Sequence, residues 1–552
     1  MEIDPLMARC LVLRGVRDAA SARDFLQPSI DELLDPFELP DMDTAAQRFA
    51  QALLNHETVL IHGDADVDGL SGTALLAGFL RSMSCEPVVH VPNRAFEDYS
   101  FNARSLQRVA DSGATLVISV DNGTTSIAPI AELQARGVDV IVTDHHLPEG
   151  ELPAALAVVN PVRSDSTYPN RALAGVGVAF KLCCATATKL HARQQASEGV
   201  SRFLGEALAW VAMGTVSDIM TLQGENRMLV SRGLRAIAMS TSPGLKALRK
   251  VAGIGSRCEA EDIAFRIAPR LNAASRMGRS ELSVELVTAT DPNRARELAQ
   301  LLDDANKERQ SAERQMLMDL APLVEAIPPD EAVVLAGEGW NPGLLGLACG
   351  RLARARGTPA VLVNARADGP SKGSSRSVPG FDVHAALGAC EHHLLTFGGH
   401  RMAAGFAMDP ANMEGLRRDF QALWTEHQKH AEAPPHEFDG ELPLAAVTEG
   451  LVKGIERLAP FGEGNRRPVL GCLGVRVIEA KRMGGDGSHL TAQLAQGPMS
   501  LRAVAFGAGD RVDELPAGAE IDILFTPKIN RFRGRANVEL ELVDLRPRTG
   551  PR

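Results

Sequence analysis

Three aspartates and a histidine lie within seven residues near the start of the chain. They are His62, Asp64, Asp66 and Asp68, and they follow the aliphatic run 59–61, which is typical of a buried parallel strand. Carboxylates gathered at the end of a buried strand repel one another, so they either splay into water or hold a divalent cation. An EF-hand is disfavoured, because its loop needs further oxygen ligands and a closing Glu.

Two later strand-like segments, 114–120 and 138–143, end in polar clusters of a similar kind. The residues directly after them are, in chain order, Asp121, Asn122, Gly123, Asp144, His145 and His146. Each cluster alone is more often a turn or a surface loop. Strand and helix patterns alternate here, which predicts a parallel, doubly wound sheet whose ligands bind at the carboxyl ends of the strands. Three clusters at one edge indicate a metal-dependent site, to which Asp218 adds a fourth acidic position.

The composition is that of a globular enzyme with several domains. The 552 residues exceed one compact core, 45% of them are hydrophobic and 23% charged, and no apolar run is long enough to span a bilayer. The start lacks the pattern of a signal peptide, and the eight scattered cysteines lack metal-ligand spacing, which predicts a cytoplasmic protein with reduced thiols. The net charge of −11 argues mildly against a generic polyanion binder, yet a local basic groove remains possible.

Changes of pattern divide the chain into five regions. We expect a helical lead-in at 1–50, a parallel α/β domain at 51–290 and a long helix at 291–327. A second α/β domain at 328–430 and a small all-β domain at 437–546 are expected to follow. The long helical pattern fits a connection between two lobes and an amphipathic core helix about equally. The short alternating stretches after residue 437 predict a β-barrel.

A basic segment lies near the end of the chain. Phe532 is surrounded by cations, with no acid between them, at Lys528, Arg531, Arg533 and Arg535. Cations can follow phosphates while an aromatic face accepts a base, as a platform for single strands requires. The alternative is an ordinary basic hairpin on the surface.

The polar clusters resemble the motifs of the DHH phosphoesterases in order and spacing. The matching segments are 62–69, 121–123, 144–146 and 214–218. Over its whole length the chain resembles the single-strand-specific exonucleases of that family, through segments 265–276, 340–346, 398–405 and 460–465. It departs from their pattern at Ser275, where Gly is common, at Asn341, where His is commoner, and at 95–99, which lack an expected Gly-Tyr-Gly.

The resemblance implies both architecture and activity. It implies an α/β protein with a parallel-sheet DHH catalytic domain, a smaller α/β DHH-associated domain joined by a long helix, and a C-terminal β-barrel of the OB type. The implied activity is 5′-to-3′ digestion of single-stranded DNA to 5′-mononucleotides by two-metal-ion hydrolysis, with Mn²⁺ or Mg²⁺, in DNA recombination and repair. A monomer without membrane contact, aided by a helicase and a single-strand-binding protein, is also implied.

Site residues follow from the same resemblance. The principal metal ligands are expected to be Asp66, Asp68, Asp121, His145 and Asp218, with His62 and Asp64 as further candidates. Asp121 or Asp68 is expected to bridge two ions about 3.5–4 Å apart. His146 is expected to stabilise the phosphoryl group or to protonate the leaving oxygen. The expected contacts to DNA, besides the basic segment, are Arg270, Asn272, Arg276, Arg376, Gly398, Gly399, His400 and Arg401.

Two other functions fit parts of the sequence. A DHH phosphodiesterase acting on short oligonucleotides or cyclic dinucleotides, or a pyrophosphatase-like relative, would share the catalytic half but would generally lack the C-terminal β-domain. A non-catalytic DNA-binding or scaffold protein that keeps the fold would have lost metal ligands, and here the set is complete. Both alternatives are therefore less favoured than the exonuclease.

Overall fold

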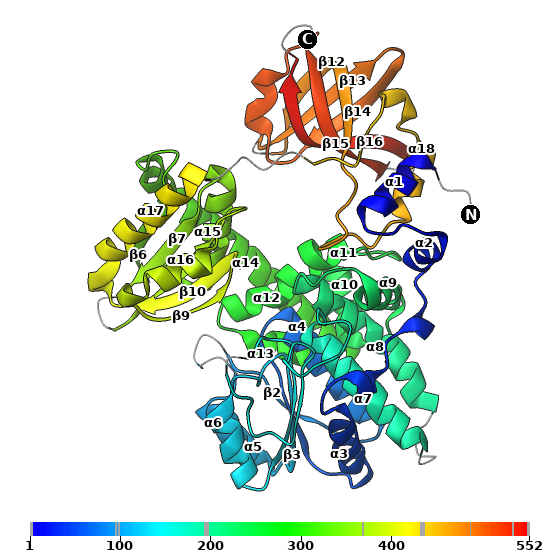
Figure 1. Cartoon of the computed structure of the whole chain (residues 1–552), viewed down its shortest axis with the longest axis vertical. Helices are drawn as coiled ribbons and strands as arrows, with labels where there is room; N and C mark the ends of the chain where they lie inside the picture. Colours follow the sequence, from blue (N-terminus) through cyan, green and yellow to red (C-terminus); the bar gives the residue numbers. More distant parts are fainter. Residues whose placement is uncertain are drawn as a thin grey trace.

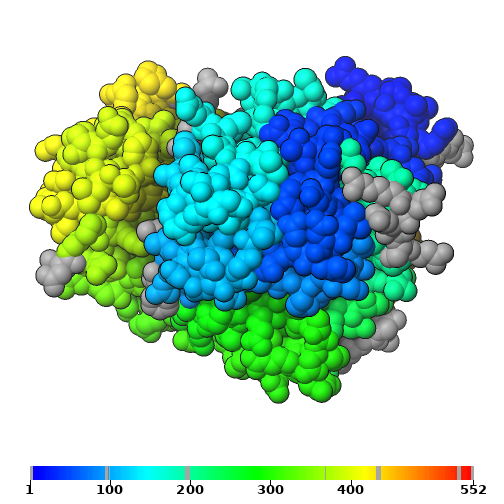
Figure 2. All heavy atoms as spheres, turned by 90° about the horizontal axis from the view of Figure 1, so that it is seen from below, coloured from blue at the N-terminus to red at the C-terminus, as the bar shows by residue number. Residues whose placement is uncertain are grey.

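The computed structural model describes residues 4–93, 97, 100–148, 150–192, 198–366, 369–430, 437–485, 487–532 and 535–548. The chain forms three bodies, with a C-terminal barrel at one end, the catalytic domain at the other and a second lobe beside it (Figure 1). Seen from the end opposite the barrel, the second lobe, yellow to green, lies directly against the catalytic domain (Figure 2). None of the helices in the described ranges has the length and apolar character needed to cross a bilayer.

The catalytic domain is built on a five-stranded sheet in which every pairing is parallel, as the sequence predicts. Its order is β2-β1-β3-β4-β5. The strands are β1 Val59–His62, β2 Val88–His90, β3 Leu116–Val120, β4 Asp139–Thr143 and β5 Ala157–Val159. Helix α3, Met42–Leu54, precedes β1, and the helices between the strands are α4 Val67–Ser82, α5 Ala103–Ser112 and α6 Ile127–Ala135. The central strands β1 and β3 are buried along their whole length, which explains their continuous apolar sequences.

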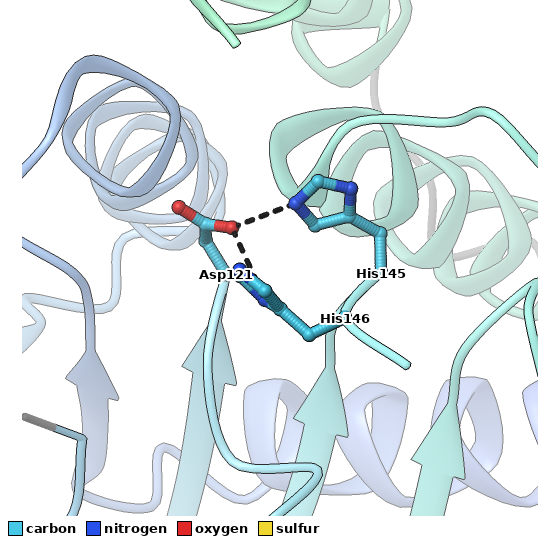
Figure 3. Close-up of side chains that lie close together, drawn as sticks. All are labelled: Asp121, His145 and His146. Carbon is cyan, nitrogen blue, oxygen red and sulfur yellow. Dashed lines mark hydrogen bonds and ion pairs between the residues drawn. The ribbon is translucent and has the colours of Figure 1, made fainter. Parts of the chain in front are cut away.

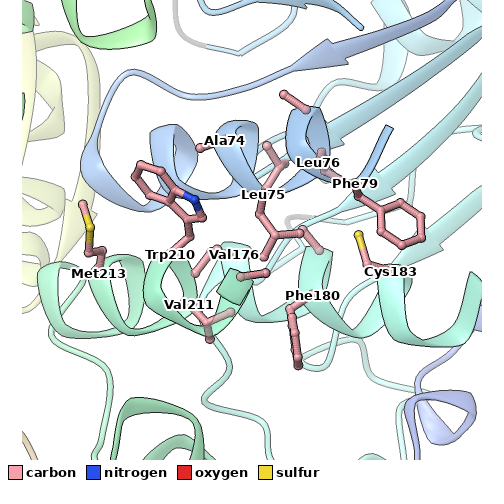
Figure 4. Close-up of a cluster of buried hydrophobic side chains, with 14 of the residues drawn as sticks. Ala74, Leu75, Leu76, Phe79, Val176, Phe180, Cys183, Trp210, Val211 and Met213 are labelled. Carbon is pink, nitrogen blue, oxygen red and sulfur yellow. The ribbon is translucent and has the colours of Figure 1, made fainter. Parts of the chain in front are cut away.

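A layer of packed helices supports the edge of this sheet. Helices α4, α7 (Gly175–Ala192) and α8 (Glu198–Ser217) interdigitate through Leu75, Val176 and Trp210 (Figure 4). The domain continues through α9 Gly224–Met239, α10 Pro243–Val251, α11 Ala260–Asp262, a π-helical turn Ile263–Ile267, α12 Ala268–Arg276 and α13 Ser280–Thr288. Close packing of this kind leaves the start of α4, the start of α7 and the end of α8 little freedom to move.

One helix connects the catalytic domain with the second lobe. Helix α14, Pro292–Glu325, has 34 residues and extends about 50 Å at 1.5 Å per residue. Leu298 and Leu302, in its first half, are buried in the catalytic core, and Met316 and Leu320, in its second half, are buried in the core of the second lobe. The predicted connecting helix is therefore confirmed, and each half is also a core helix of its own lobe.

The second lobe is a smaller α/β domain around a mixed sheet of order β6-β7-β8-β10-β9. Its strands are β6 Val333–Glu338, β7 Ala360–Ala365, β8 Ser371–Arg376, β9 Leu394–His400 and β10 Ala403–Met408. Its helices are α15 Pro342–Arg356, α16 Val383–Ala389 and α17 Met413–His430. Asn341, where the family commonly has His, caps α15 by accepting a 2.9 Å hydrogen bond from the Gly343 amide.

The C-terminal domain is a closed barrel, as the alternating pattern predicts. Its sheet order is β11-β12-β13-β14-β16-β15, and β12 also pairs with β15, which closes the barrel. The elements are β11 Gly440–Glu441, α18 Glu449–Glu456, β12 Leu470–Met483, β13 His489–Gln496, β14 Met499–Ala505, β15 Glu520–Phe532 and β16 Arg535–Pro547.

The start of the chain packs on this distant barrel. Helix α1 (Pro5–Leu13) contributes Met7, Cys10 and Leu11 to the barrel's hydrophobic core, and α2 (Ala19–Leu26) contributes Ala22. Arg14 donates hydrogen bonds to the Asn465 side chain and the Arg466 carbonyl, at 2.8 and 2.6 Å. Leu39 and α3 instead belong to the catalytic core. The expected lead-in 1–50 is thus divided between two domains, because its helices bury their apolar faces on different partners.

Candidate metal centre and active site

The polar clusters converge on His145 at the carboxyl edge of the catalytic sheet. Its Nε2 lies 3.1 Å from Asp121 Oδ1, 3.5 Å from Asp218 Oδ2 and 3.8 Å from Asp68 Oδ2. Figure 3 shows one oxygen of the Asp121 carboxylate facing the rings of both His145 and His146. The loop after β3, the loop after β4, the first turn of α4 and the end of α8 therefore meet at one point.

The candidate ligands fall into two adjoining groups. Ligand atoms of Asp64, Asp66 and Asp121 lie within 4.8 Å of one another, and so do those of Asp68, His145 and Asp218. The 3.1 Å contact between Asp121 and His145 joins the groups. Of the two carboxylates expected to bridge metal ions, this arrangement favours Asp121.

The electrostatics of the cluster fit a cation site. Burial, and then the charge of the neighbouring aspartates, raises the pKa of Asp68 and Asp121 well above the usual value. The same causes raise the pKa of Asp218 to about 7. Buried carboxylates so close together are stable in the ionised form when a cation offsets their repulsion. Carboxylate oxygens combined with imidazole nitrogen suit Mn²⁺, with Mg²⁺ as a competitor.

Helix ends fix two of the carboxylates. Asp66 caps α4, accepting hydrogen bonds from the amides of Asp68 and Gly69 at 3.0 and 3.2 Å. Asp68 accepts hydrogen bonds at 2.6 and 3.0 Å from the amides of Gly175 and Val176, at the start of α7. The amides at a helix N-terminus stabilise negative charge. The segment with the three aspartates is therefore a loop held between two helices, and the alternative interpretation as a solvated turn is wrong.

Three glycines make room for the carboxylates. A Cβ atom at Gly69, Gly175 or Gly214 would collide with Asp64, Asp121 or Asp68, respectively. Sequence reasoning placed Gly69 and Gly214 in motifs without a reason for them, and it missed Gly175. Their proximity to the aspartates depends on how α4, α7 and α8 pack, and no local pattern indicates it.

We expect Gly214→Ala to lower the metal-dependent activity at least about tenfold, because the added methyl group displaces Asp68 and a 1 Å misplacement can cost about 100-fold. The measurement is kcat as a function of Mn²⁺ concentration. Gly205→Ala is the matched control, since Gly205 lies on the same helix and an added Cβ there meets nothing within 4 Å. Equal activity of the two variants would contradict the role given to Gly214.

Asp144 is a positioning residue to which sequence reasoning gave no role. Its buried carboxylate accepts hydrogen bonds from the amides of Thr124 and His145, at 3.0 and 2.8 Å, and lies 2.7 Å from His146 Nδ1. Although burial acts in the opposite direction, the hydrogen bond to Asp144 raises the pKa of His146 to about 9. Burial lowers the pKa of His145 to about 4, so the two adjacent histidines differ in charge.

His62 lies apart from the two ligand groups. Its ring nitrogens are 3.0 Å from Asn122 Oδ1 and 2.9 Å from Ser105 Oγ, and its ring stacks on Phe101. Burial lowers the pKa of His62 to about 3, so the ring is neutral. This placement differs from the expected ligand role, since both nitrogens are engaged. The neutral ring instead supports the loop that carries Asp121.

The glycine-rich motif of the second lobe faces this centre. His400, at the end of β9, is among the groups that lower the pKa of His145, after burial and the neighbouring His146. A Cβ at Gly398 would meet nothing within 4 Å, so its backbone is open to a close approach. Gly399 has φ +137° and packs against the backbone of Ala403, so its conformation requires glycine for a reason other than a ligand.

Of the other residues expected to contact DNA, some line a cavity and others are bound to groups of the protein itself. Arg270 is held by Asp303 of α14 at 2.8 Å, which indicates a structural bond between α12 and α14. Asn272 and Arg276 line a cavity of about 500 Å³ that also borders Ser217, next to Asp218. Arg376 and Arg401 donate hydrogen bonds to the carbonyls of Ser375 and Gly380, respectively, at 2.8 and 3.4 Å.

The basic segment of the barrel is less free of acids than its sequence suggests. Lys528 lies 2.5 Å from Glu541 across the hairpin and 3.6 Å from Glu261 of the catalytic domain. These acids are distant in sequence and become neighbours through the pairing of β15 with β16. Arg533 lies outside the described residues, as do the side chains of Arg531, Phe532 and Arg535 and most of the segment 95–99.

Comparisons with known proteins agree with this geometry. The DHH family N-terminal domain matches residues 58–215, the DHHA1 domain 330–426 and the RecJ OB domain 438–544. The single-stranded-DNA-specific exonuclease RecJ of Dickeya dadantii is 33% identical over 98% of this chain and 96% of its own length. The crystal structure of RecJ from Thermus thermophilus with Mn²⁺ has a TM-score of 0.82 and 32% identity, covering 99% of this chain and 76% of that one. Its complex with Mg²⁺ has a TM-score of 0.76 and 30% identity, covering 99% and 75%. The chain therefore belongs to the RecJ family of DHH phosphoesterases.

Proposed function

We propose that this protein is a metal-dependent exonuclease specific for single-stranded DNA, which digests from the 5′ end and releases 5′-mononucleotides. The observation that carries the proposal is the convergence of two ligand groups, joined by Asp121 and His145, at one edge of the sheet. The similarity to RecJ proteins over nearly the whole chain supports single-stranded DNA as the substrate. Mn²⁺ or Mg²⁺ is the cofactor, held by Asp64, Asp66, Asp68, Asp121, His145 and Asp218.

The chemistry that bound divalent cations supply is the activation of water and the neutralisation of phosphoryl charge. Asp144 orients His146, whose positive charge stabilises charge developing on the phosphoryl group. His400 and the open backbone at Gly398 lie on the facing lobe and offer contacts to the 5′ phosphate. No side chain of the site needs to act as a nucleophile.

The barrel supports a polymeric substrate over a dinucleotide. OB barrels bind single strands over several nucleotides, whereas hydrolysis of a short oligonucleotide or a cyclic dinucleotide needs no such barrel. The proposal further includes a role in DNA recombination and repair within the cytoplasm. The protein acts as a monomer, and its partners are a helicase and a single-strand-binding protein. Such partners would supply the separated strand that an exonuclease of this specificity needs.

Digestion of one long strand, labelled at either end and compared with its blunt duplex, tests the proposal in Mn²⁺. We expect early release of a labelled mononucleotide from the 5′ label alone, and no digestion of the duplex. Release from the 3′ label first would overturn the polarity. An intact long strand, together with rapid cleavage of dinucleotides, would assign the protein to the alternative phosphodiesterase class.

We expect Mn²⁺ to raise the melting temperature, because an ion that binds only the folded state stabilises it by mass action. At 100 times the dissociation constant the gain is about 2.7 kcal/mol, or roughly 5–11 °C for a domain of 150–250 residues. Asp218→Asn should remove most of this shift and should stabilise the metal-free protein, since burial, and then repulsion by neighbouring aspartates, raises the pKa of Asp218 in the folded state. Calorimetry with and without EDTA provides the measurement, and an undiminished shift in the variant would exclude Asp218 as a ligand.

A further inference from the structure

A sizeable cavity lies between the catalytic domain and the C-terminal barrel. Its volume is about 800 Å³, within the range of sites that hold sizeable ligands. Helix α9 forms one wall, and residues 456–461 with Arg467 form another, on the side of the catalytic domain that faces the barrel (Figure 1). Neither the metal centre nor its expected DNA contacts account for this cavity.

Arginines dominate the charge of the cavity. Three of the five in its walls have partners: Arg257 lies 3.2 Å from Glu259, Arg467 lies 3.2 Å from Glu261, and Arg457 has an interaction of its own. Arg232 and Arg235 are one helical turn apart on α9, and neither has an ion pair within the described ranges. The Nε atom of Arg232 is buried without a hydrogen-bond partner there.

The unpartnered Nε of Arg232, with Arg235 one turn away, suits an anion. A buried donor that lacks a partner costs about 1–3 kcal/mol, and guanidinium groups match phosphate oxygens in geometry. Ser231 and Ser256 add hydroxyl groups to the same walls. The chemistry of the cavity is therefore that of a phosphate site with several donors.

The position of the cavity indicates which phosphate it receives. It shares Ala260, Glu261 and Phe461 with the second cavity of about 500 Å³, which borders Ser217 and Ile219 on either side of Asp218 in sequence. In that second cavity the exposed ring of Phe265, 77% accessible on the π-helical turn, offers a face for a base. The two cavities together lead from the metal centre towards the barrel.

We infer that the cavity beneath α9 binds the sugar-phosphate backbone of the substrate strand, distal to the scissile end, through Arg232 and Arg235. This inference rests on the proposed function and extends it, because it assigns a further strand-binding site between the catalytic domain and the barrel. Long strands occupy this site, whereas a trinucleotide held at the metal centre leaves it empty. Affinity for long strands then depends on α9.

The test is the salt dependence of strand binding by Arg232→Gln/Arg235→Gln. The protein carries Asp121→Asn in addition, so that a fluorescent strand is not digested. Each phosphate contact to a single strand contributes about 0.7 to the slope of log affinity against log salt, so the slope should fall by about 1.4 and the affinity at 0.1 M salt roughly 20-fold. Arg235→Gln alone, at an exposed residue, should lower the slope by about 0.7.

Lys246→Gln/Lys250→Gln is the matched control, since both lysines are exposed on the adjacent α10 and lie outside the cavity. The control removes the same charge and should leave the slope unchanged. In proteins with an intact metal centre, the ratio of kcat/KM for a long strand to that for a trinucleotide should fall about tenfold in the arginine variant alone.

The possible outcomes separate this inference from the proposed function. If the parent protein binds long strands and the arginine variant binds them with the same slope, the inference is wrong and the proposed function stands. The same holds if the lysine control loses as much as the arginine variant, since the effect is then one of net charge. If the parent protein binds no single strand at all, both fail.

Discussion

Asp121→Asn is expected to reduce kcat for digestion of single-stranded DNA at least about 1,000-fold, which corresponds to about 4 kcal/mol of transition-state stabilisation. Asp121 belongs to one ligand group and contacts the other through His145, so its loss affects every ion that the site holds. The fall should appear in kcat at saturating Mn²⁺, and more metal should not restore it.

Asparagine is the informative replacement at this position. Asp121 has φ +64°, in the left-handed region that Asp and Asn tolerate better than other side chains, so the variant keeps the loop and changes the charge. Asp111→Asn, at an exposed residue of α5, makes the same chemical change away from the site and should retain full activity. Activity of Asp121→Asn within tenfold of the wild type would mean that this cluster is not the catalytic centre.

His146→Gln is expected to lower kcat about 100- to 1,000-fold while leaving metal binding intact. His146 lies 2.7 Å from Asp144 and 3.9 Å from Asp121, at the margin of the cluster, with 37% of its side chain exposed. A charged donor there stabilises the transition state, and removal of one such donor typically costs 100- to 1,000-fold. The measurements are kcat and the Mn²⁺-induced shift in melting temperature.

Comparison with His145 separates two roles for His146. His145→Gln should lose both activity and the Mn²⁺ shift, since His145 is surrounded by three carboxylates. If His146→Gln also loses the shift, His146 is a metal ligand, which its distance from Asp121 would allow. Asp144→Asn should reproduce a part of the His146→Gln defect, with the shift retained, because Asp144 acts by holding His146 in place.

The features that the sequence predicted correctly depend on short-range patterns. Continuous apolar runs at 59–61 and 114–120 indicated buried parallel strands, and the acids after them had to lie at one edge because parallel strands share a direction. Helical periodicity over 291–327 likewise indicated α14, and alternation after residue 437 indicated the barrel. In each case the information lies within a few residues of the feature itself.

The features that the sequence did not reveal depend on contacts between distant segments. His62 stands beside three aspartates in sequence, yet its ring turns to Ser105 and Asn122, and its neutral form follows from that burial. Lys528 appeared to belong to an acid-free segment until strand pairing placed Glu541 beside it. The first helices looked like a lead-in to the catalytic domain, but α1 completes the core of the barrel.

The sequence by itself therefore indicated the three domains, the helix that joins two of them and the candidate metal-ligand residues, because residue type and local periodicity specify these. Tertiary structure alone decided which candidates share a centre, through the packing of α4, α7 and α8 against Gly175 and Gly214. It also decided that Arg232 and Arg235 of α9 line a cavity, where the Nε of Arg232 meets no hydrogen-bond partner among the described residues. The burial of a side chain sets its charge, and its distance from other groups sets which of them it contacts. Burial and distance are fixed only when remote segments pack together.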